Sequence, residues 1–135
     1  EALILALYRE DAESEAMSRE KARATFLALT EYPDRGRILL IRNEETILGY
    51  AILTFCWNSE FGGRFVNVDD LYLKPDQRNQ GIATEFFRWL DQAYRDSAAA
   101  FSIETSPSNH SAGRLYLRNG FRPAHSIHLI KRPNK

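Results

Sequence analysis

One short stretch, Arg78-Asn79-Gln80-Gly81-Ile82-Ala83-Thr84, has the residue types of an anion-binding turn. The first backbone N–H groups of a helix have no partner inside the helix, and the helix dipole adds partial positive charge there. Gly81 and Ala83 are small enough to let an anion approach these groups, and Arg78 adds a full charge. The stretch therefore predicts a cradle for a pyrophosphate group. An ordinary strand-to-helix turn, in which the glycine only provides tightness, explains the same spacing.

The flanking segments are those that such a cradle requires. Residues 66–73 alternate apolar and polar side chains and are rich in Val, Leu and Tyr, which is typical of a strand. Pro75 cannot donate to a ladder, so the strand should end before it. Downstream, Ile82, Phe86 and Leu90 recur at helical spacing and predict a helix that runs to about Ser97.

The same patterns predict the remaining elements. Ser18 is expected to cap a helix whose inward residues are Ala22, Phe26 and Leu29. The order of elements predicts a single α/β domain over residues 1–135, with a mixed, mostly antiparallel central sheet flanked by helices. The expected helices are residues 2–8, 18–32 and 111–119, and the further expected strands are residues 37–42, 47–57, 98–104 and 126–132.

Composition excludes several classes of protein. Eighteen acidic and eighteen basic residues leave no net charge to favour nucleic acid or a membrane surface as a partner. The chain has no long apolar span and no signal-peptide pattern, so we expect a soluble, cytoplasmic protein. The single cysteine, Cys56, rules out an internal disulfide framework and is expected to be a buried structural thiol. The three histidines lack the spacing of metal ligands, so no metal is expected.

Two motifs in sequence order resemble the GCN5-related N-acetyltransferase (GNAT) superfamily. Residues 78–83 resemble its Arg/Gln-x-x-Gly-x-Gly/Ala signature, and residues 68–73 are similar to its fourth strand. Residues 109–112 and 115–121 resemble its Asn-x-x-Ala and Tyr-x-x-x-Gly-Phe segment. The resemblance covers about residues 37–131. It implies the acyl-coenzyme A N-acyltransferase fold, whose first strand we expect to lie outside this numbering.

The resemblance also implies acetyl-coenzyme A as the co-substrate. Residues 71–73 would offer backbone groups to the pantetheine arm and to the oxyanion, and residues 78–84 would hold the pyrophosphate. Asn109 would bond the pantetheine arm, and Ala112 would leave room for it. The cofactor-binding residues implied in this way are Leu71, Tyr72, Leu73, Arg78, Asn79, Gln80, Gly81, Ile82, Ala83, Thr84, Asn109 and Ala112.

Three residues are candidates for proton transfer. An amine with a pKa of about 10.4 must lose a proton before it can attack a thioester at neutral pH. Asp69 and Asp70 lie on opposite faces of the predicted strand, and family members use a carboxylate at either position. Asp69 is slightly favoured, and two structural strand-end carboxylates are the alternative. Tyr116 matches the family tyrosine that protonates the coenzyme A thiolate; without the resemblance, core packing would explain it.

The predicted function is transfer of the acetyl group of acetyl-coenzyme A to a primary amine of a small molecule, polyamine-like or other. The amine would attack directly in a ternary complex. The alternatives are a protein lysine or N-terminal acetyltransferase and a non-catalytic acyl-coenzyme A-binding regulatory module. Acidic residues at positions 9–15 would attract a cationic amine or form a solvated loop, and Trp57 and Phe61 could line an acceptor pocket or a satellite core. Many family members are dimers, so a homodimer is an open expectation.

Overall fold

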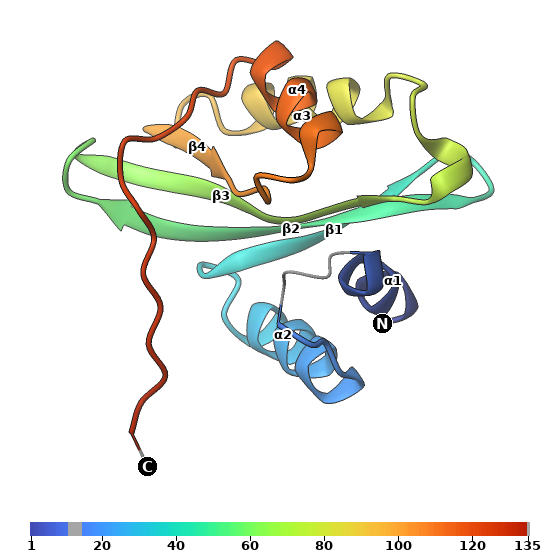
Figure 1. Cartoon of the computed structure of the whole chain (residues 1–135), viewed down its shortest axis with the longest axis horizontal. Helices are drawn as coiled ribbons and strands as arrows, with labels where there is room; N and C mark the ends of the chain where they lie inside the picture. Colours follow the sequence, from blue (N-terminus) through green and yellow to red (C-terminus); the bar gives the residue numbers. More distant parts are fainter. Residues whose placement is uncertain (11–14, 135) are drawn as a thin grey trace.

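The computed structural model describes residues 1–10 and 15–134, which form a four-stranded sheet with helices on both faces (Figure 1). The strand order is β1-β2-β3-β4; β1, β2 and β3 are antiparallel, and β4 is parallel to β3. This confirms the predicted mixed, mostly antiparallel sheet. The elements are α1 (Ala2–Glu10), α2 (Arg19–Glu31), β1 (Gly36–Arg42), β2 (Ile47–Asn58), β3 (Gly63–Leu73), the 3₁₀ helix η1 (Pro75–Gln77), α3 (Ile82–Ala93), β4 (Ala100–Ile103) and α4 (His110–Arg118).

Side-chain hydrogen bonds to the backbone fix the two hairpins that join β1 to β2 and β2 to β3. The Asn43 side-chain oxygen accepts from the backbone N–H groups of Glu45 (3.2 Å) and Thr46 (2.9 Å) in the β1–β2 turn. In the β2–β3 turn, the Asn58 oxygen accepts from the backbone of Phe61 at 3.0 Å. These Asx-type bonds replace ladder bonds that the chain loses at each reversal.

The predicted helices form, with two differences. Ser18 caps α2 as expected, because its hydroxyl accepts from the Lys21 backbone at 3.2 Å. Ala22 is buried, but Phe26 is 57% exposed and is not part of an inward face, since α2 contacts the sheet along a narrow strip. The helix predicted to reach Ser97 ends at Ala93, and the backbone from Tyr94 onward continues in turns.

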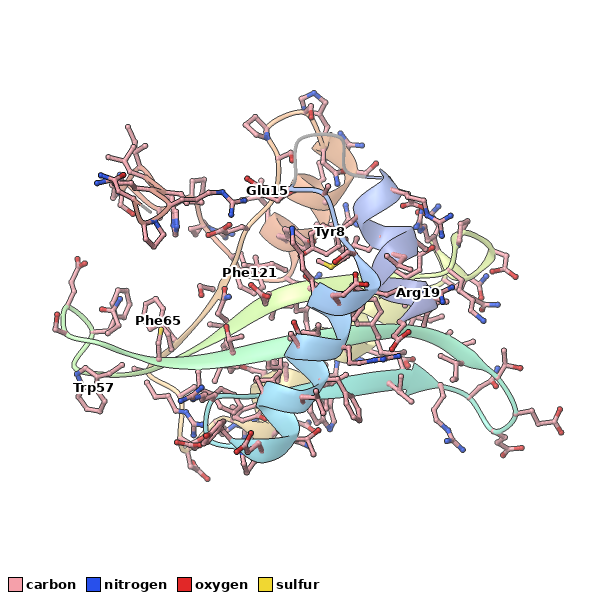
Figure 2. All side chains as sticks on the ribbon, turned by 90° about the horizontal axis from the view of Figure 1, so that it is seen from below. Tyr8, Glu15, Arg19, Trp57, Phe65 and Phe121 are labelled. Atoms are coloured by element: carbon pink, nitrogen blue, oxygen red, sulfur yellow. The ribbon has the colours of Figure 1, made fainter. Side chains whose placement is uncertain are left out.

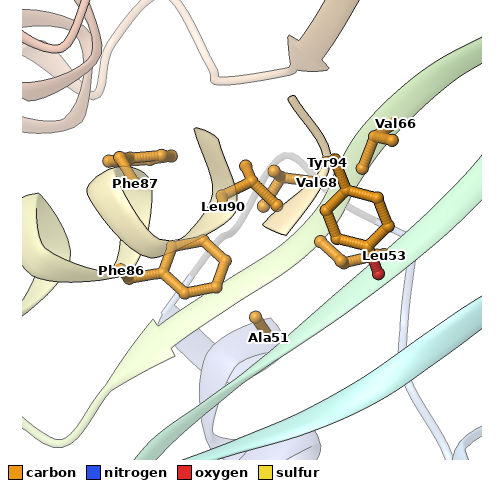
Figure 3. Packing of buried hydrophobic residues seen from close by; sticks show 8 residues of the cluster. All are labelled: Ala51, Leu53, Val66, Val68, Phe86, Phe87, Leu90 and Tyr94. Atoms are coloured by element: carbon orange, nitrogen blue, oxygen red, sulfur yellow. The ribbon is translucent and has the colours of Figure 1, made fainter. Parts of the chain in front are cut away.

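The two faces of the sheet carry separate cores. On the face of α3, the fully buried residues Leu53, Val66 and Leu90 pack with neighbouring aromatic rings (Figure 3). On the face of α1 and α2, Tyr50 and Ile52 pack with apolar residues of both helices. The sheet is therefore a scaffold buried on both sides, and its strands cannot shift without disturbing one core.

A β-bulge in β3 lies at the centre of the sheet. Ile52 of β2 pairs with Asp70, whereas the next residue, Leu53, pairs with Val68. Asp69 is thus the extra residue of the bulge, and the strand changes face there. Pairing of β3 with β4 also ends at Val68, opposite Ile103. Beyond this point β3 has no neighbour on the β4 side among the described residues, so the two strands diverge.

Two further predictions are wrong. Residues 126–132 do not form a strand: the chain after α4 runs across the sheet direction and away from the body (Figure 1), and it pairs with no strand in the described part of the chain. Cys56 is exposed rather than buried, because the β2–β3 hairpin extends beyond the helices that cover the sheet. No helix in residues 1–10 and 15–134 is long and apolar enough to cross a membrane.

The close approach of β2 to β3 at Gly49 gives a stability prediction. A Cβ atom on Gly49 would lie 2.0 Å from the backbone oxygen of Tyr72, so Gly49→Ala should lower the free energy of unfolding by at least about 1–3 kcal/mol. Gly113→Ala is the control, because its Cβ meets nothing within 4 Å on a helix and should stabilise by about 0.5–1 kcal/mol. Urea denaturation measures both, and equal midpoints would contradict this reading of the strand contact.

Candidate functional site

A cleft of about 620 Å³ lies where β3 and β4 diverge, between β3, the first turn of α3 and α4. It brings together both motifs recognised in the sequence. Of the residues predicted to bind cofactor or to donate a proton, those that line it are Leu71, Tyr72, Leu73, Arg78, Asn79, Gly81, Ile82, Ala83, Thr84, Asn109, Ala112 and Tyr116. Gln80 does not line it; its amide donates to the Asp76 backbone oxygen at 2.9 Å.

The first turn of α3 forms the cradle end of the cleft. Gly81 is the N-cap residue with φ of 81°, a left-handed conformation that favours glycine, and no side chain caps the helix. The N–H groups of residues 82–84 lie in the first turn, where no carbonyl of the helix can reach them. A Cβ atom on Gly81 would meet nothing within 4 Å, so the approach to these donors is open. Such a turn fits a phosphate group.

The Arg78 side chain lines the cleft and already has hydrogen-bond partners. Its Nη2 donates to both carboxylate oxygens of Glu10, at 3.1 and 2.8 Å, and its Nε donates to the Leu73 backbone oxygen at 3.0 Å. Its guanidinium carbon lies 5.5 Å from the centroid of the Tyr72 ring. These contacts hold the side chain against β3, and they place a carboxylate from α1 beside the cradle.

Sequence reasoning missed five residues that line the cleft: Glu10, Ser111, Arg114, Leu115 and Arg118. Arg114 and Arg118 lie one turn apart on α4, so both guanidinium groups lie on the cleft side of the helix. Among the described residues that line the cleft there are thus three cationic side chains, with Arg78 the third, and one carboxylate, that of Glu10. The sequence did contain a signal for the two arginines, since they follow the Asn109 motif four residues apart, which places them on one side of a helix.

Asn109 and Tyr116 lie on the α4 side of the cleft. The Asn109 side-chain oxygen accepts from the Ala112 backbone at 3.2 Å and caps α4, so this residue also has a structural role. The ring of Tyr116 packs edge-on against Phe87, with centroids 5.9 Å apart. Burial raises the pKa of Tyr116, so its phenol keeps its proton at neutral pH and can act as a donor.

The two aspartates have different surroundings. Asp70 is only 5% exposed; its carboxylate oxygens accept from the hydroxyls of Tyr8 (3.0 Å) and Tyr50 (2.9 Å). Burial raises the pKa of Asp70, and the two tyrosine hydrogen bonds oppose that rise. Burial first, and then the Asp70 charge, raise the pKa of Tyr50.

Asp69 remains accessible to solvent at the bulge. The protein around it nevertheless removes part of its water, which raises its pKa, and the charges of Asp70 and Glu104 raise it further. Neither aspartate is among the residues that line the cleft, although Asp70 directly precedes Leu71, which does. The site therefore has an accessible carboxyl group and a buried one at the point where β3 leaves β4.

The other candidate residues lie elsewhere. Trp57 and Phe61 are 72% and 57% exposed at the end of the β2–β3 hairpin and are not among the residues that line the cleft. Figure 2 shows Trp57 well apart from Tyr8. Of the acidic segment at residues 9–15, positions 11–14 lie outside the described residues. Within the rest of the chain, no group of three or more His, Cys, Asp or Glu side chains is placed to hold a metal ion.

The sequence is similar to a known protein family and to one of its characterised members. A sequence model of the acetyltransferase (GNAT) family matches residues 3–121. The chain is 25% identical over 88 residues to an aminoalkylphosphonate N-acetyltransferase of Salmonella typhimurium; the match covers 64% of this chain and 56% of that protein. The chain thus spans little more than half the length of that relative.

Solved structures share the fold. An integron cassette protein from the mobile metagenome of Cole Harbour Salt Marsh is 28% identical with a TM-score of 0.82, over 99% of this chain and 82% of the other. An aminoglycoside N-acetyltransferase, solved in complex with CoA, has a TM-score of 0.70 at 14% identity, over 85% and 88% of the two chains. The latter similarity concerns the fold alone.

The open cradle predicts a specific loss of ligand binding. Gly81→Glu adds bulk and negative charge before the N–H groups of α3 and should weaken coenzyme A binding at least about tenfold, measured by calorimetry. Gly62→Glu is the matched control, because Gly62 has a similar φ of 64° and open surroundings but lies in the β2–β3 turn. Equal affinities of the two variants would refute the cradle.

Proposed function

The chain belongs to the acetyltransferase (GNAT) family, and on that premise we propose that it transfers the acetyl group of acetyl-coenzyme A to a primary amine of a small molecule. The observation that carries this proposal is the cleft itself. It joins the α3 cradle to the Asn109–Tyr116 side of α4 across the part of β3 that lies beyond its pairing with β4. This arrangement suits a long, anionic ligand better than a compact one.

Different residues of the cleft would bind different parts of the cofactor. When bound, acetyl-coenzyme A supplies an activated thioester. The N–H groups of residues 82–84 and the guanidinium groups of Arg78, Arg114 and Arg118 would bind its phosphates. Those backbone groups of residues 71–73 that face away from β2 would bind the pantetheine amides in the manner of an added strand, and one of their N–H groups would stabilise the oxyanion.

Asp69 is the proposed base. It is accessible to an incoming amine, and its raised pKa makes it a stronger proton acceptor than an ordinary aspartate. Asp70 is the second choice, because its two oxygens already accept hydrogen bonds from tyrosines. After proton removal, the neutral amine would attack the thioester directly in a ternary complex.

Tyr116 is the proposed acid. It lines the cleft, and its raised pKa keeps the phenol protonated until the sulfur leaves as a thiolate. A module that only binds acyl-coenzyme A needs neither a half-buried phenol in the cleft nor a carboxyl group with a raised pKa near it. The pair therefore favours turnover over simple binding.

An assay of coenzyme A release tests the proposed function. Acetyl-coenzyme A would be offered with a panel of aminoalkylphosphonates, polyamines, aminoglycosides, amino acids and lysine peptides. We expect turnover on one class of small amine. Turnover on lysine peptides alone would indicate that the acceptor is a protein and not a small molecule. Thermal stabilisation by acetyl-coenzyme A with no turnover on any member would contradict the enzymatic proposal and favour the binding module.

Removal of the Tyr116 hydroxyl tests whether this residue is the general acid. Tyr116→Phe should lower kcat by about 10²-fold or more while leaving the affinity for coenzyme A nearly unchanged, because the ring still packs on Phe87. Tyr32→Phe, an exposed tyrosine at the end of α2, is the control. An unchanged kcat in Tyr116→Phe would remove this residue as the acid.

The pH dependence of the rate separates the two aspartates. A base must be deprotonated, so kcat/KM should fall as the pH drops through its pKa; for Asp69 this limb lies above the ordinary value of about 3.9. Asp69→Asn should lower kcat/KM by about 10²–10⁴-fold and abolish the limb, whereas Asp70→Asn should retain it. If the limb disappears in Asp70→Asn instead, the roles are reversed. If it survives in both, the base lies elsewhere.

A further inference from the structure

A buried carboxyl group that the preferred mechanism does not use lies between the sheet and α1. Asp70 is only 5% exposed and faces α1, which covers the face of the sheet opposite α3 and α4 (Figure 1). Taking a carboxylate out of water is costly, and replacing buried charged groups by well-packed apolar residues is often neutral or stabilising. The stability of the fold alone therefore does not explain a carboxyl group at this position.

Two tyrosine hydroxyls hold the Asp70 carboxyl group in place. Tyr8 of α1 donates to its Oδ1 atom at 3.0 Å, and Tyr50 of β2 donates to its Oδ2 atom at 2.9 Å. Each donated hydrogen bond stabilises the ionised form of a carboxyl group more than the protonated form. The two bonds therefore oppose the effect of burial, which raises the pKa of Asp70.

The other neighbours of this carboxyl group are largely apolar. Ile4 of α1 and Ala22 of α2 belong to the same core, and the Tyr72 ring lies 6.2 Å from the Tyr50 ring. Within the described part of the chain, no lysine, arginine or histidine forms an ion pair with Asp70. The two hydroxyls are thus the groups that compensate a negative charge on Asp70.

A charge on Asp70 acts directly on the proposed base. Asp69 is the extra residue of the β3 bulge and remains exposed. Partial burial raises the pKa of Asp69 most, and the charges of Asp70 and Glu104 raise it further. Glu104 follows β4, and its carboxylate lies 3.5 Å from the Nδ1 atom of His128. Because Asp70 is buried, salt and water screen its charge less than they screen that of an exposed group.

We propose that Tyr8 and Tyr50 are positioning residues for the reaction: they keep Asp70 ionised in the interior, and its fixed negative charge makes Asp69 a stronger proton acceptor. The inference rests on the proposed function, because it takes Asp69 as the base. It gives the two adjacent aspartates different tasks, since one accepts the proton and the other sets how strongly the proton is held. Packing of α1 on the sheet then contributes to the strength of the base.

The direction of the effect follows from the order in which the two carboxyl groups take up protons. On this proposal, Asp70 is charged while Asp69 titrates. Without one tyrosine hydroxyl, Asp70 takes up its proton at a higher pH, and Asp69 then titrates beside a neutral neighbour. The pKa of Asp69 falls, so the acidic limb of kcat/KM moves to lower pH. Damage to the fold alone would lower the rate without extending activity into more acidic solution.

The pH dependence of kcat/KM in Tyr8→Phe and in Tyr50→Phe tests the proposal. Each substitution keeps the ring and should move the acidic limb by about 0.5–1 pH unit to lower pH; Asp70→Asn, which removes the charge outright, should move it at least as far. Tyr94→Phe is the control, because it removes a buried tyrosine hydroxyl, the partner of Arg37, from the opposite core. A limb that stays in place in the two tyrosine variants, or that moves as far in Tyr94→Phe, would overturn the proposal.

An NMR titration of the aspartate carboxyl carbons tests the coupling without turnover. Tyr8→Phe should raise the pKa of Asp70 and lower that of Asp69, whereas a general loosening of the fold would move both toward the ordinary value. Glu104→Gln should lower the pKa of Asp69 with no change at Asp70. Unchanged aspartate pKa values in Tyr8→Phe would refute the positioning role alone. An acidic limb that survives Asp69→Asn would instead refute the choice of base in the proposed function.

Discussion

The structure depends on one constraint, the extra residue that β3 carries at Asp69. Because two residues of β3 oppose one step of β2 there, Val68 faces α3 while Asp70 faces α1. The same point is the last at which β4 follows β3. A local irregularity in the ladder thus turns one carboxyl group into the interior, leaves another accessible and frees a length of backbone. Each of these features belongs to the candidate site.

The two cores explain why the bulge is fixed in place. Leu53 and Val66 are packed against α3, and Tyr50 and Ile52 are packed against the first two helices. A slip of one residue would exchange these faces and place Asp70 among aliphatic and aromatic side chains without its tyrosine partners. Packing on both sides of the sheet therefore positions the polar residues between them.

Local features were predictable from the sequence, and long-range ones were not. The strand, the turn and the α3 cradle follow from neighbouring residues, above all Pro75 and Gly81, and the α4 side of the cleft followed from a motif. Tyr8 and Asp70 are 62 residues apart and Glu10 and Arg78 are 68 apart, so no local pattern could pair them. The misplaced strand at residues 126–132 has the correct composition, but no local pattern specifies the edge that it needs.

The pairing of Arg78 with Glu10 has a consequence for anion binding in this cleft. An anion that reaches Arg78 displaces a carboxylate that the arginine already holds, so the guanidinium exchanges one negative partner for another. The net attraction is the difference between two ionic contacts, which is smaller than that of a bare cation. Salt screens both contacts, so Arg78 contributes little to the change of binding affinity with ionic strength. Discrimination among anions at this position then rests on geometry and hydrogen bonding more than on charge.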